Sequence, residues 1–298
     1  MFKVLLSTTI LLFALTAVKA QESTVIKKGA KLKLISDKFK FTEGPASDKK
    51  GNVYFTDQPN NRILKWNAKT DSITTFMNNA GRANGLYIDK NQNLYACADL
   101  KFELWKIDQQ KKVTVLLDSY NNKKLNGPND LWVDDKGGIY FTDPYYQRDY
   151  WSRQHPEMKD QKVYYLSPDG KNLSIAAENF IKPNGIIGSS KKGILYIADI
   201  GANKTYAYTI APDGKLIDKR LFVSQGSDGM TMDHKGNIYL TGKGVTIYNK
   251  NGEKIEHIEV NKDWTANVTF GGTHHHILFI TASNSVYTIE MKTKSNQW

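Results

Sequence analysis

A short strand-forming pattern occurs six times along this chain, and this repeat restricts the fold more than any other feature. Each copy has a polar turn containing Gly or Lys, then a short strand with Tyr or Phe that ends in a small or acidic residue. The aromatic residues recur 40 to 56 residues apart, at Tyr54, Tyr95, Tyr140, Tyr196, Tyr239 and Phe279. Repeats of this period, with β-rich runs between turn signals, are typical of propeller blades. Since almost no segment has helical periodicity, the sequence predicts an all-β fold, a six-bladed β-propeller.

The first copy indicates how each blade is built from four strands. Its inner strand is predicted at residues 44–48, and the next three at residues 52–57, 63–66 and 73–77. The last copy supplies only three strands, at residues 267–270, 277–282 and 286–289. One alternating segment, residues 31–35, remains unassigned near the N-terminus. We expect this N-terminal strand to complete the last blade and so close the ring without a disulfide.

The first twenty residues have the pattern of a secretory signal peptide. Lys3 precedes an apolar run that ends at Val18, and small residues suit a cleavage point after Ala20. The run of about 15 residues is shorter than the ~20 needed to cross a bilayer as a helix, which favours cleavage over a membrane anchor. We therefore expect residues 1–20 to be removed and residues 21–298 to form a single propeller domain. The mature protein would be secreted or periplasmic.

The formal net charge of +11 is not concentrated in one stretch. Basic residues lie in separate turns, such as Lys49-Lys50 and Lys191-Lys192, and no nucleic-acid motif accompanies them. A nucleic-acid partner is therefore not expected. The single cysteine, Cys97, excludes an intrachain disulfide. Within its apolar strand we interpret it as a small buried residue and not as a nucleophile.

A side chain with an oxygen atom stands eleven or twelve residues before each repeated aromatic residue. The six are Glu43, Asn84, Asn129, Asn184, Asp228 and Asn267. Because each lies where an inner strand begins, we expect all six to converge on one mouth of the central channel. Asn-Gly and Asp-Gly are ordinary turn dipeptides, but that interpretation explains neither Glu43 nor six oxygen carriers at equivalent positions. Two carboxylates among neutral amides suit a hard cation such as Ca²⁺ better than Zn²⁺, which favours His or Cys.

Four motifs in this order resemble those of the gluconolactonase and senescence-marker (regucalcin) family. They are Thr42-Glu43-Gly44-Pro45, Asn126-Gly127-Pro128-Asn129-Asp130, Lys182-Pro183-Asn184-Gly185 and Ser227-Asp228-Gly229-Met230. The resemblance extends over roughly residues 35–290 and implies a six-bladed propeller with one axial divalent cation. It implies that Glu43, Asn129, Asn184 and Asp228 are the metal ligands and that Asn84 belongs to the substrate pocket. Ca²⁺ is the expected metal, with Mg²⁺, Mn²⁺ and Zn²⁺ as alternatives.

The resemblance also implies the opening of a lactone. Asp228 would be the catalytic general base, or a direct nucleophile as in the related diisopropyl fluorophosphatase. The metal would polarise the lactone carbonyl, and no Gly-X-Ser-X-Gly elbow supplies another nucleophile. Many bacterial gluconolactonases have an acidic residue, His and Gly after the strand equivalent to that of Cys97, whereas this chain has Asp99-Leu100-Lys101. That departure leaves the particular lactone open.

The longest interval between repeats contains an aromatic segment after Asp143, residues 144–151. By the strand directions, this segment leaves at the mouth where the six oxygen-bearing side chains converge; these six residues are called the oxygen ring below. Tyr145 would stack there on a sugar ring and Arg148 would pair with a carboxylate; an ordinary packed loop is the alternative. The acidic residues that end equivalent second strands are expected to cap the following turns: Asp57, Asp99, Asp143 and Asp199.

These features predict a metal-dependent hydrolase that opens a sugar lactone to its hydroxy acid, with a small-molecule lactone as its partner. Hydrolysis of a phosphotriester or another ester at the same metal is a second hypothesis. A non-catalytic, ligand-binding propeller is a third, but such a scaffold would not need Glu43 and Asp228 at the axis. The oligomeric state is left open by the sequence.

Overall fold

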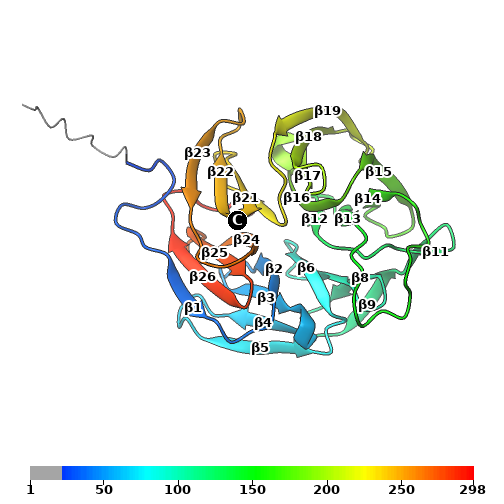
Figure 1. Cartoon of the computed structure of the whole chain (residues 1–298), viewed down its shortest axis with the longest axis horizontal. Helices are drawn as coiled ribbons and strands as arrows, with labels where there is room; N and C mark the ends of the chain where they lie inside the picture. Colours follow the sequence, from blue (N-terminus) through cyan, green and yellow to red (C-terminus); the bar gives the residue numbers. More distant parts are fainter. Residues whose placement is uncertain (1–21) are drawn as a thin grey trace, which may run out of the picture.

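The computed structural model describes residues 22–298 and confirms the six-bladed β-propeller (Figure 1). The predicted signal peptide, residues 1–20, lies outside the described residues. Each blade is an antiparallel sheet, and the inner strands surround a central channel. Within residues 22–298 no helix has the length and apolar character required to span a membrane.

The first four blades follow one another along the chain. Blade 1 contains β2 (Thr42–Ser47), β3 (Val53–Asp57), β4 (Arg62–Trp66) and β5 (Ile73–Asn78). Blade 2 contains β6 (Ala83–Ile88), β7 (Leu94–Ala98), β8 (Glu103–Ile107) and β9 (Val113–Leu117). Blade 3 contains β12 (Leu131–Val133), β13 (Ile139–Asp143), β14 (Gln161–Leu166) and β15 (Leu173–Phe180). Blade 4 contains β16 (Pro183–Ser189), β17 (Ile194–Asp199), β18 (Lys204–Ile210) and β19 (Leu216–Val223). Short elements in the connections are η1 (Gln58–Asn60), η2 (Ser190–Lys192), β10 (Ser119–Tyr120) and β11 (Lys123–Lys124).

The last two blades close the ring. Blade 5 contains β20 (Met230–Met232), β21 (Ile238–Gly242), β22 (Gly244–Tyr248) and β23 (Lys254–Ile258). Blade 6 contains β24 (Thr265–Gly271), β25 (Ile277–Ala282), β26 (Ser285–Glu290) and, as its outer strand, β1 (Lys33–Ser36). Leu34 of β1 stands opposite Tyr287 of β26 in an antiparallel pair. The prediction that an N-terminal strand completes the last blade is therefore confirmed, although β1 begins two residues later than expected.

The apolar core lies between neighbouring blades. At the closing seam, the Phe55 ring of blade 1 is 5.5 Å from the Phe279 ring of blade 6, and Trp66 packs on the same ring. The repeated aromatic side chains of Tyr140, Tyr239 and Phe279 are fully buried. Burying a large apolar side chain contributes about 1.5–3 kcal/mol. The repeat therefore exists because each blade presents an aromatic side chain to its neighbour.

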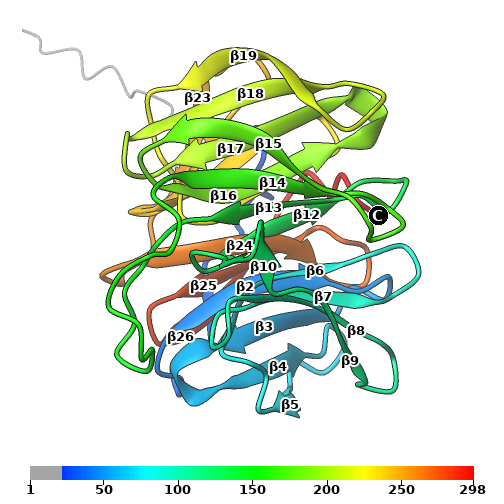
Figure 2. The same ribbon diagram turned by 90° about the vertical axis from the view of Figure 1, so that its right-hand side faces the viewer.

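The segment Thr293–Trp298 crosses the end of the propeller opposite to the long loop that follows β13 (Figure 2). Its hydrogen bonds reach four blades: Asn296 N to Met232 O, Ser295 N to His275 O, Gln297 Nε2 to Ile88 O and Trp298 Nε1 to Ser47 Oγ. The Trp298 ring also packs against the cluster between blades 1 and 2. This segment holds the two ends of the ring together on the face away from Glu43.

Candidate metal centre and active site

Four of the six oxygen-bearing residues lie at or next to irregularities in the pairing of inner and second strands. Glu43 pairs with Thr56 whereas Ala46 pairs with Tyr54, so two residues of β2 stand opposite one residue of β3. Equivalent breaks include Asn84 and Asn184, and a one-residue break lies at Ala266, next to Asn267. A β-bulge of this kind bends the strand and re-aims a side chain. The bulges therefore explain how residues at strand entrances turn toward one mouth of the channel.

The glycines that follow these residues have a packing role. A Cβ on Gly85 would lie 2.5 Å from the backbone oxygen of Asn129 in the next blade, and a Cβ on Gly185 would lie 2.6 Å from that of Asp228. Neither glycine has a positive φ. Close approach of the neighbouring inner strand, and not a turn conformation, requires glycine at these positions. The Asn84-Gly85 and Asn184-Gly185 dipeptides are therefore part of the contact between neighbouring blades.

The two carboxylates of the ring receive hydrogen bonds from neighbouring blades. Asn184 Nδ2 donates to Asp228 Oδ1 at 2.8 Å, and Asn267 Nδ2 donates to Glu43 Oε2 at 3.1 Å. Glu43 is buried, while Asp228 is partly exposed. Residues from blades 1, 4, 5 and 6 therefore meet at one point, although more than 200 residues separate Glu43 from Asn267.

The environment raises the pKa of both carboxyl groups. Burial raises the pKa of Glu43 well above its usual value, and the negative charge of Asp228 adds to this; the Gly44 N–H opposes it. Burial raises the pKa of Asp228 to about 6, against hydrogen bonds from Trp264 and Asn184 and the charge of Arg148. A cation between the two carboxylates would remove their repulsion and favour their ionised forms.

The remaining donor atoms are neutral amides. Asn84 and Asn129 are buried, and within the described part of the chain Asn84 Oδ1 has no hydrogen-bond partner. Within residues 22–298, no group of three or more His, Cys, Asp or Glu side chains is arranged to hold a metal ion. The ring therefore combines two carboxylates with amide oxygens, a donor set that fits a hard cation such as Ca²⁺. An orphaned, buried carbonyl oxygen is consistent with a ligand at this point.

The loop after β13 reaches over the ring. The hydroxyl of Tyr146 accepts a hydrogen bond of 2.9 Å from Asn184 Nδ2. Arg148 Nε donates to Asp99 Oδ2 at 3.2 Å, which ties the loop of blade 3 to the end of β7 in blade 2. The loop thus spans three blades at the mouth.

Tyr145 makes its contacts inside the loop. Its hydroxyl bonds to Gln147, its ring lies 5.8 Å from the Trp151 ring, and its backbone N–H donates to Gln161 Oε1. Tyr146, the next residue, is the one whose hydroxyl touches Asn184. A pocket role for Tyr145 stays a prediction, and Tyr146 joins the candidate site.

Among the acidic residues that end second strands, Asp99 has different partners. Asp143 accepts from the backbone N–H groups of Asn126 and Gly127, and Asp57 and Asp199 also accept from backbone N–H groups that precede their inner strands. The Asp99 carboxylate instead accepts from the side chains of Gln58, Arg148 and Tyr150. The prediction that these residues cap the following turns is therefore wrong for Asp57 and Asp143, whose backbone partners precede the inner strands. It holds for Asp199, which also accepts from Ala202 N–H, while Asp99 organises side chains at the mouth.

Sequence reasoning missed Tyr146, Trp264 and Asp130. Trp264 Nε1 donates to Asp228 Oδ2 at 2.6 Å, from just before β24. Asp130 is buried next to Asn129, and burial raises its pKa to about 7. Asp130 could have been noticed within the Asn129-Asp130 motif. Nothing in the repeat pattern singles out Trp264 or Tyr146, because both lie outside the six aligned strands.

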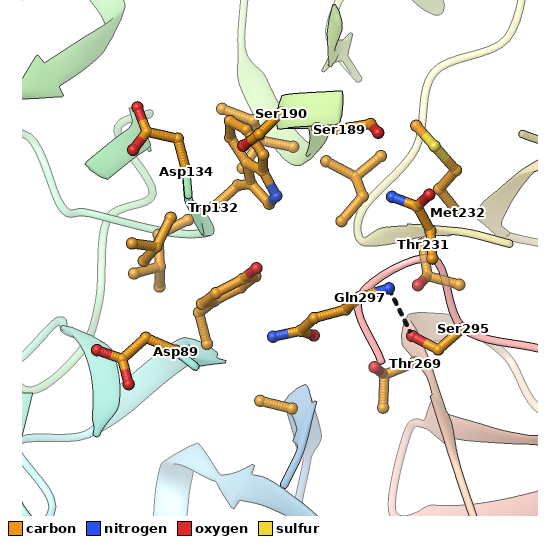
Figure 3. A pocket seen from close by; sticks show the side chains of 18 of the residues that line it. Asp89, Trp132, Asp134, Ser189, Ser190, Thr231, Met232, Thr269, Ser295 and Gln297 are labelled. Carbon is orange, nitrogen blue, oxygen red and sulfur yellow. Dashed lines mark hydrogen bonds between the residues drawn. The ribbon is translucent and has the colours of Figure 1, made fainter. Parts of the chain in front are cut away.

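A cavity of about 380 Å³ continues the channel on the other side of the ring (Figure 3). Asp130 and Asn267 lie at its inner end, and Trp132, Thr231 and Met232 line its wall. Ser295 and Gln297 border the cavity, so the segment Thr293–Trp298 covers part of its outer end. Space is therefore present on the axis, on the side of the oxygen-bearing residues away from the mouth.

Comparisons with known proteins agree with this geometry. A gluconolactonase of Zymomonas mobilis is 27% identical over 292 residues, covering 88% of this chain and 82% of that protein. The structure of a gluconolactonase from Xanthomonas campestris superposes with a TM-score of 0.82 at 28% identity, covering 89% of this chain and 91% of the other. The calcium-binding protein regucalcin from Agrobacterium tumefaciens shares the fold at 16% identity, with a TM-score of 0.75 and coverage of 88% and 94%.

The sequence pattern of the family described as SMP-30/Gluconolactonase/LRE-like region matches residues 41–284. That range includes the five complete blades and β24 and β25 of the sixth, together with Glu43, Asn129, Asn184 and Asp228. With its six-bladed fold and its oxygen-bearing side chains at one mouth, this chain belongs to the SMP-30/gluconolactonase/LRE-like family of lactonase-type hydrolases.

Proposed function

We propose that this protein is a metal-dependent lactonase that opens a sugar lactone to its hydroxy acid. The observation that carries the proposal is the pairing of Glu43 and Asp228 at the channel mouth, each hydrogen-bonded to an asparagine of a neighbouring blade. Relatives of similar length are named gluconolactonase, which supports a lactone as the substrate class.

Glu43, Asn129, Asn184 and Asp228 would hold the divalent cation, with Ca²⁺ as the expected metal. Their oxygen atoms and the charge of two carboxylates suit Ca²⁺, and regucalcin of the same fold is described as calcium-binding. When bound, the cation supplies Lewis acidity to a lactone carbonyl. Asn84 Oδ1 has no hydrogen-bond partner among residues 22–298 and would accept from a substrate hydroxyl.

Asp228 is the proposed general base. The Trp264 indole and the Asn184 amide each hold one of its oxygens, so the carboxylate has a defined orientation. Bound metal would oppose its protonation and keep Asp228 ionised at neutral pH, so that the carboxylate can accept a proton from water. Attack of that water on the carbonyl carbon breaks the acyl C–O bond. The proton then passes from Asp228 to the released ring oxygen, which gives the hydroxy acid.

The loop after β13 would cover the bound lactone. Tyr146 already contacts Asn184, and Arg148 is anchored on Asp99. Together they limit access of water to the mouth and leave Arg148 close to the substrate. Export through the signal peptide at residues 1–20 is part of the proposal, and it implies that the substrate is encountered outside the cytoplasm.

The test is pH-stat hydrolysis of gluconolactone, galactonolactone, homoserine lactone and one phosphotriester, each with Ca²⁺ and with a chelator. Asp228→Ala and Glu43→Gln are compared with Asp169→Asn, which changes an exposed hairpin carboxylate. Calcium-dependent opening of a sugar lactone that both site variants abolish and the control retains supports the proposal. A protein that binds Ca²⁺ and opens no lactone refutes it, and selective phosphotriester cleavage would favour the esterase hypothesis.

A further inference from the structure

Two cationic side chains lie over the ring of Tyr146 beside the oxygen ring. The guanidinium carbon of Arg148 is 5.4 Å from the centre of the Tyr146 ring, and Lys182 Nζ is 4.4 Å from it. The Tyr146 hydroxyl contacts Asn184, so both positive charges stand about one tyrosine ring away from a proposed metal ligand.

Most of the hydrogen-bonding capacity of these cations is unused. Arg148 bonds to Asp99 only through Nε, and among the described residues its two terminal nitrogens have no partner. Within residues 22–298, Lys182 forms no ion pair. The Arg148 side chain is 24% exposed, whereas that of Asp99 is 3% exposed. The buried carboxylate therefore acts as an anchor, and the free edge of the guanidinium remains accessible.

The Asp99 carboxylate pairs with Arg148, and its hydrogen-bond partner Tyr150 lies under a second arginine. Arg82 lies 4.1 Å over the Tyr150 ring, and the Tyr150 hydroxyl bonds to Asp99. Arg148 is thus held by a buried carboxylate, and Lys182 lies over the same Tyr146 ring as Arg148. A planar guanidinium with two free donors binds a carboxylate or phosphate in bidentate fashion, and a nearby ammonium adds attraction.

We propose that Arg148 and Lys182 form an anion subsite beside the oxygen ring, which binds a carboxylate or phosphate carried by the lactone at the end remote from its carbonyl. Asp99 is a positioning residue that orients Arg148 through Nε. This inference rests on the proposed lactonase function and narrows its substrate class to anionic sugar lactones. Simple cation–aromatic packing is the competing explanation, and Lys219, which lies 4.3 Å over Tyr206 on the outer strand of blade 4, provides an example of it.

The experiment compares gluconolactone, which is neutral, with a glucarolactone that carries a carboxylate and with 6-phosphogluconolactone. The variants are Arg148→Gln, Lys182→Gln and Asp99→Asn, and the matched control is Lys219→Gln. We expect the ratio of kcat/KM for anionic over neutral lactone to fall about tenfold in each site variant, which corresponds to about 1.4 kcal/mol. The loss should appear in KM, because the subsite holds the substrate away from the reacting carbonyl.

Glucarolactone and 6-phosphogluconolactone show whether the subsite prefers a carboxylate or a phosphate. A preference for either anionic lactone over neutral gluconolactone supports the subsite. Equal use of neutral and anionic lactones by the wild type, or an equal loss on both in the variants, overturns the subsite and leaves the lactonase proposal intact. If no lactone is opened, the lactonase proposal fails separately. Calorimetric binding of 6-phosphogluconate and glucarate then decides the subsite. Binding that weakens in Arg148→Gln and Lys182→Gln but not in Lys219→Gln supports it, and binding equal in all four proteins overturns it.

Discussion

The indole Nε1 of Trp264 donates a hydrogen bond of 2.6 Å to Oδ2 of Asp228, joining the start of blade 6 to the start of blade 5. The other oxygen of Asp228 accepts from Asn184 of blade 4. Donors from both neighbouring blades therefore set the orientation of the carboxylate that we propose as general base. The chemistry at this position depends on side chains that Asp228 meets only in the folded ring.

Trp264→Phe should slow lactone opening while leaving the oxygen-bearing side chains at the mouth in place. A hydrogen bond to a charged group contributes about 1.5–3 kcal/mol, which corresponds to a loss of roughly 10- to 100-fold in kcat/KM. Because the lost bond favours the ionised form, the pKa of Asp228 should rise and the acid limb of the pH–rate profile should move to higher pH. An unchanged acid limb would show that Trp264 does not act through Asp228.

Calcium should raise the melting temperature because it binds to the oxygen ring of the folded protein. At a ligand concentration of about 100 times Kd, binding to the folded state adds about 2.7 kcal/mol, which raises Tm by roughly 5–10 °C in a chain of this size. Asn184→Ala and Asp228→Ala should lose the shift. Asn172→Ala, at an exposed hairpin, should keep it. A full shift in Asn184→Ala would remove that residue from the ligand set.

Without metal, the protein should lose stability as the pH rises from about 4 to about 7. The pKa of Asp228 is raised to about 6 in the folded chain, compared with about 3.9 when unfolded. The folded state therefore binds more protons in this window, and the free energy of unfolding falls as pH increases. Glu43, whose pKa is also raised, acts in the same direction. Denaturant titrations in the presence of chelator should show this fall of the free energy of unfolding with pH. Ca²⁺ competes with protons for the carboxylates and should flatten or reverse it. A chelated protein that is more stable at neutral than at acid pH would contradict the raised pKa values.

Gly85→Ala should disturb the contact between blades 2 and 3. The added methyl would lie 2.5 Å from Asn129 O and 2.7 Å from Asp130 Cα, and neither backbone atom can move without shifting the ring. Overpacking of this kind typically costs about 1–3 kcal/mol, so urea unfolding should show a lower midpoint. Gly170→Ala is the control, because its Cβ meets nothing within 4 Å although its φ is +71°. Equal effects of the two changes would show that close approach to Asn129 costs no more than the backbone strain of an alanine at Gly170.

Trp298→Ala should reduce stability without changing the active site. The Trp298 indole donates to Ser47 Oγ at 3.1 Å and its ring stacks near His275, on the face opposite to Asp228. Removal of a partly buried Trp and one hydrogen bond should cost about 2–4 kcal/mol. Thermal unfolding would measure this loss. Steady-state kinetics at low temperature should show an unchanged kcat/KM, and a large fall in it would mean that the two ends of the channel are coupled.

Much of this architecture was determined by the sequence alone. The spacing of aromatic residues predicted six blades, because each blade must present a side chain such as Phe279 to its neighbour. The missing strand in the last copy predicted that an N-terminal strand completes the last blade, and in the structure Leu34 pairs there with Tyr287. The equivalent positions of Glu43 and Asp228 placed two carboxylates at one mouth, since residues in register along a repeat occupy equivalent places in a ring.

Only the tertiary structure decided how the side chains at that mouth meet. Asp99 and Asp143 end equivalent strands, yet Asp143 binds backbone N–H groups and Asp99 binds Arg148 and Tyr150. The loop that brings Arg148 there has no counterpart in the other blades, so no repeat predicted its path, and the choice of Tyr146 over Tyr145 at Asn184 depended on that path. A repeat specifies strands through local periodicity and burial, whereas contacts within a unique loop arise between residues far apart in the chain and exist only once the ring has closed.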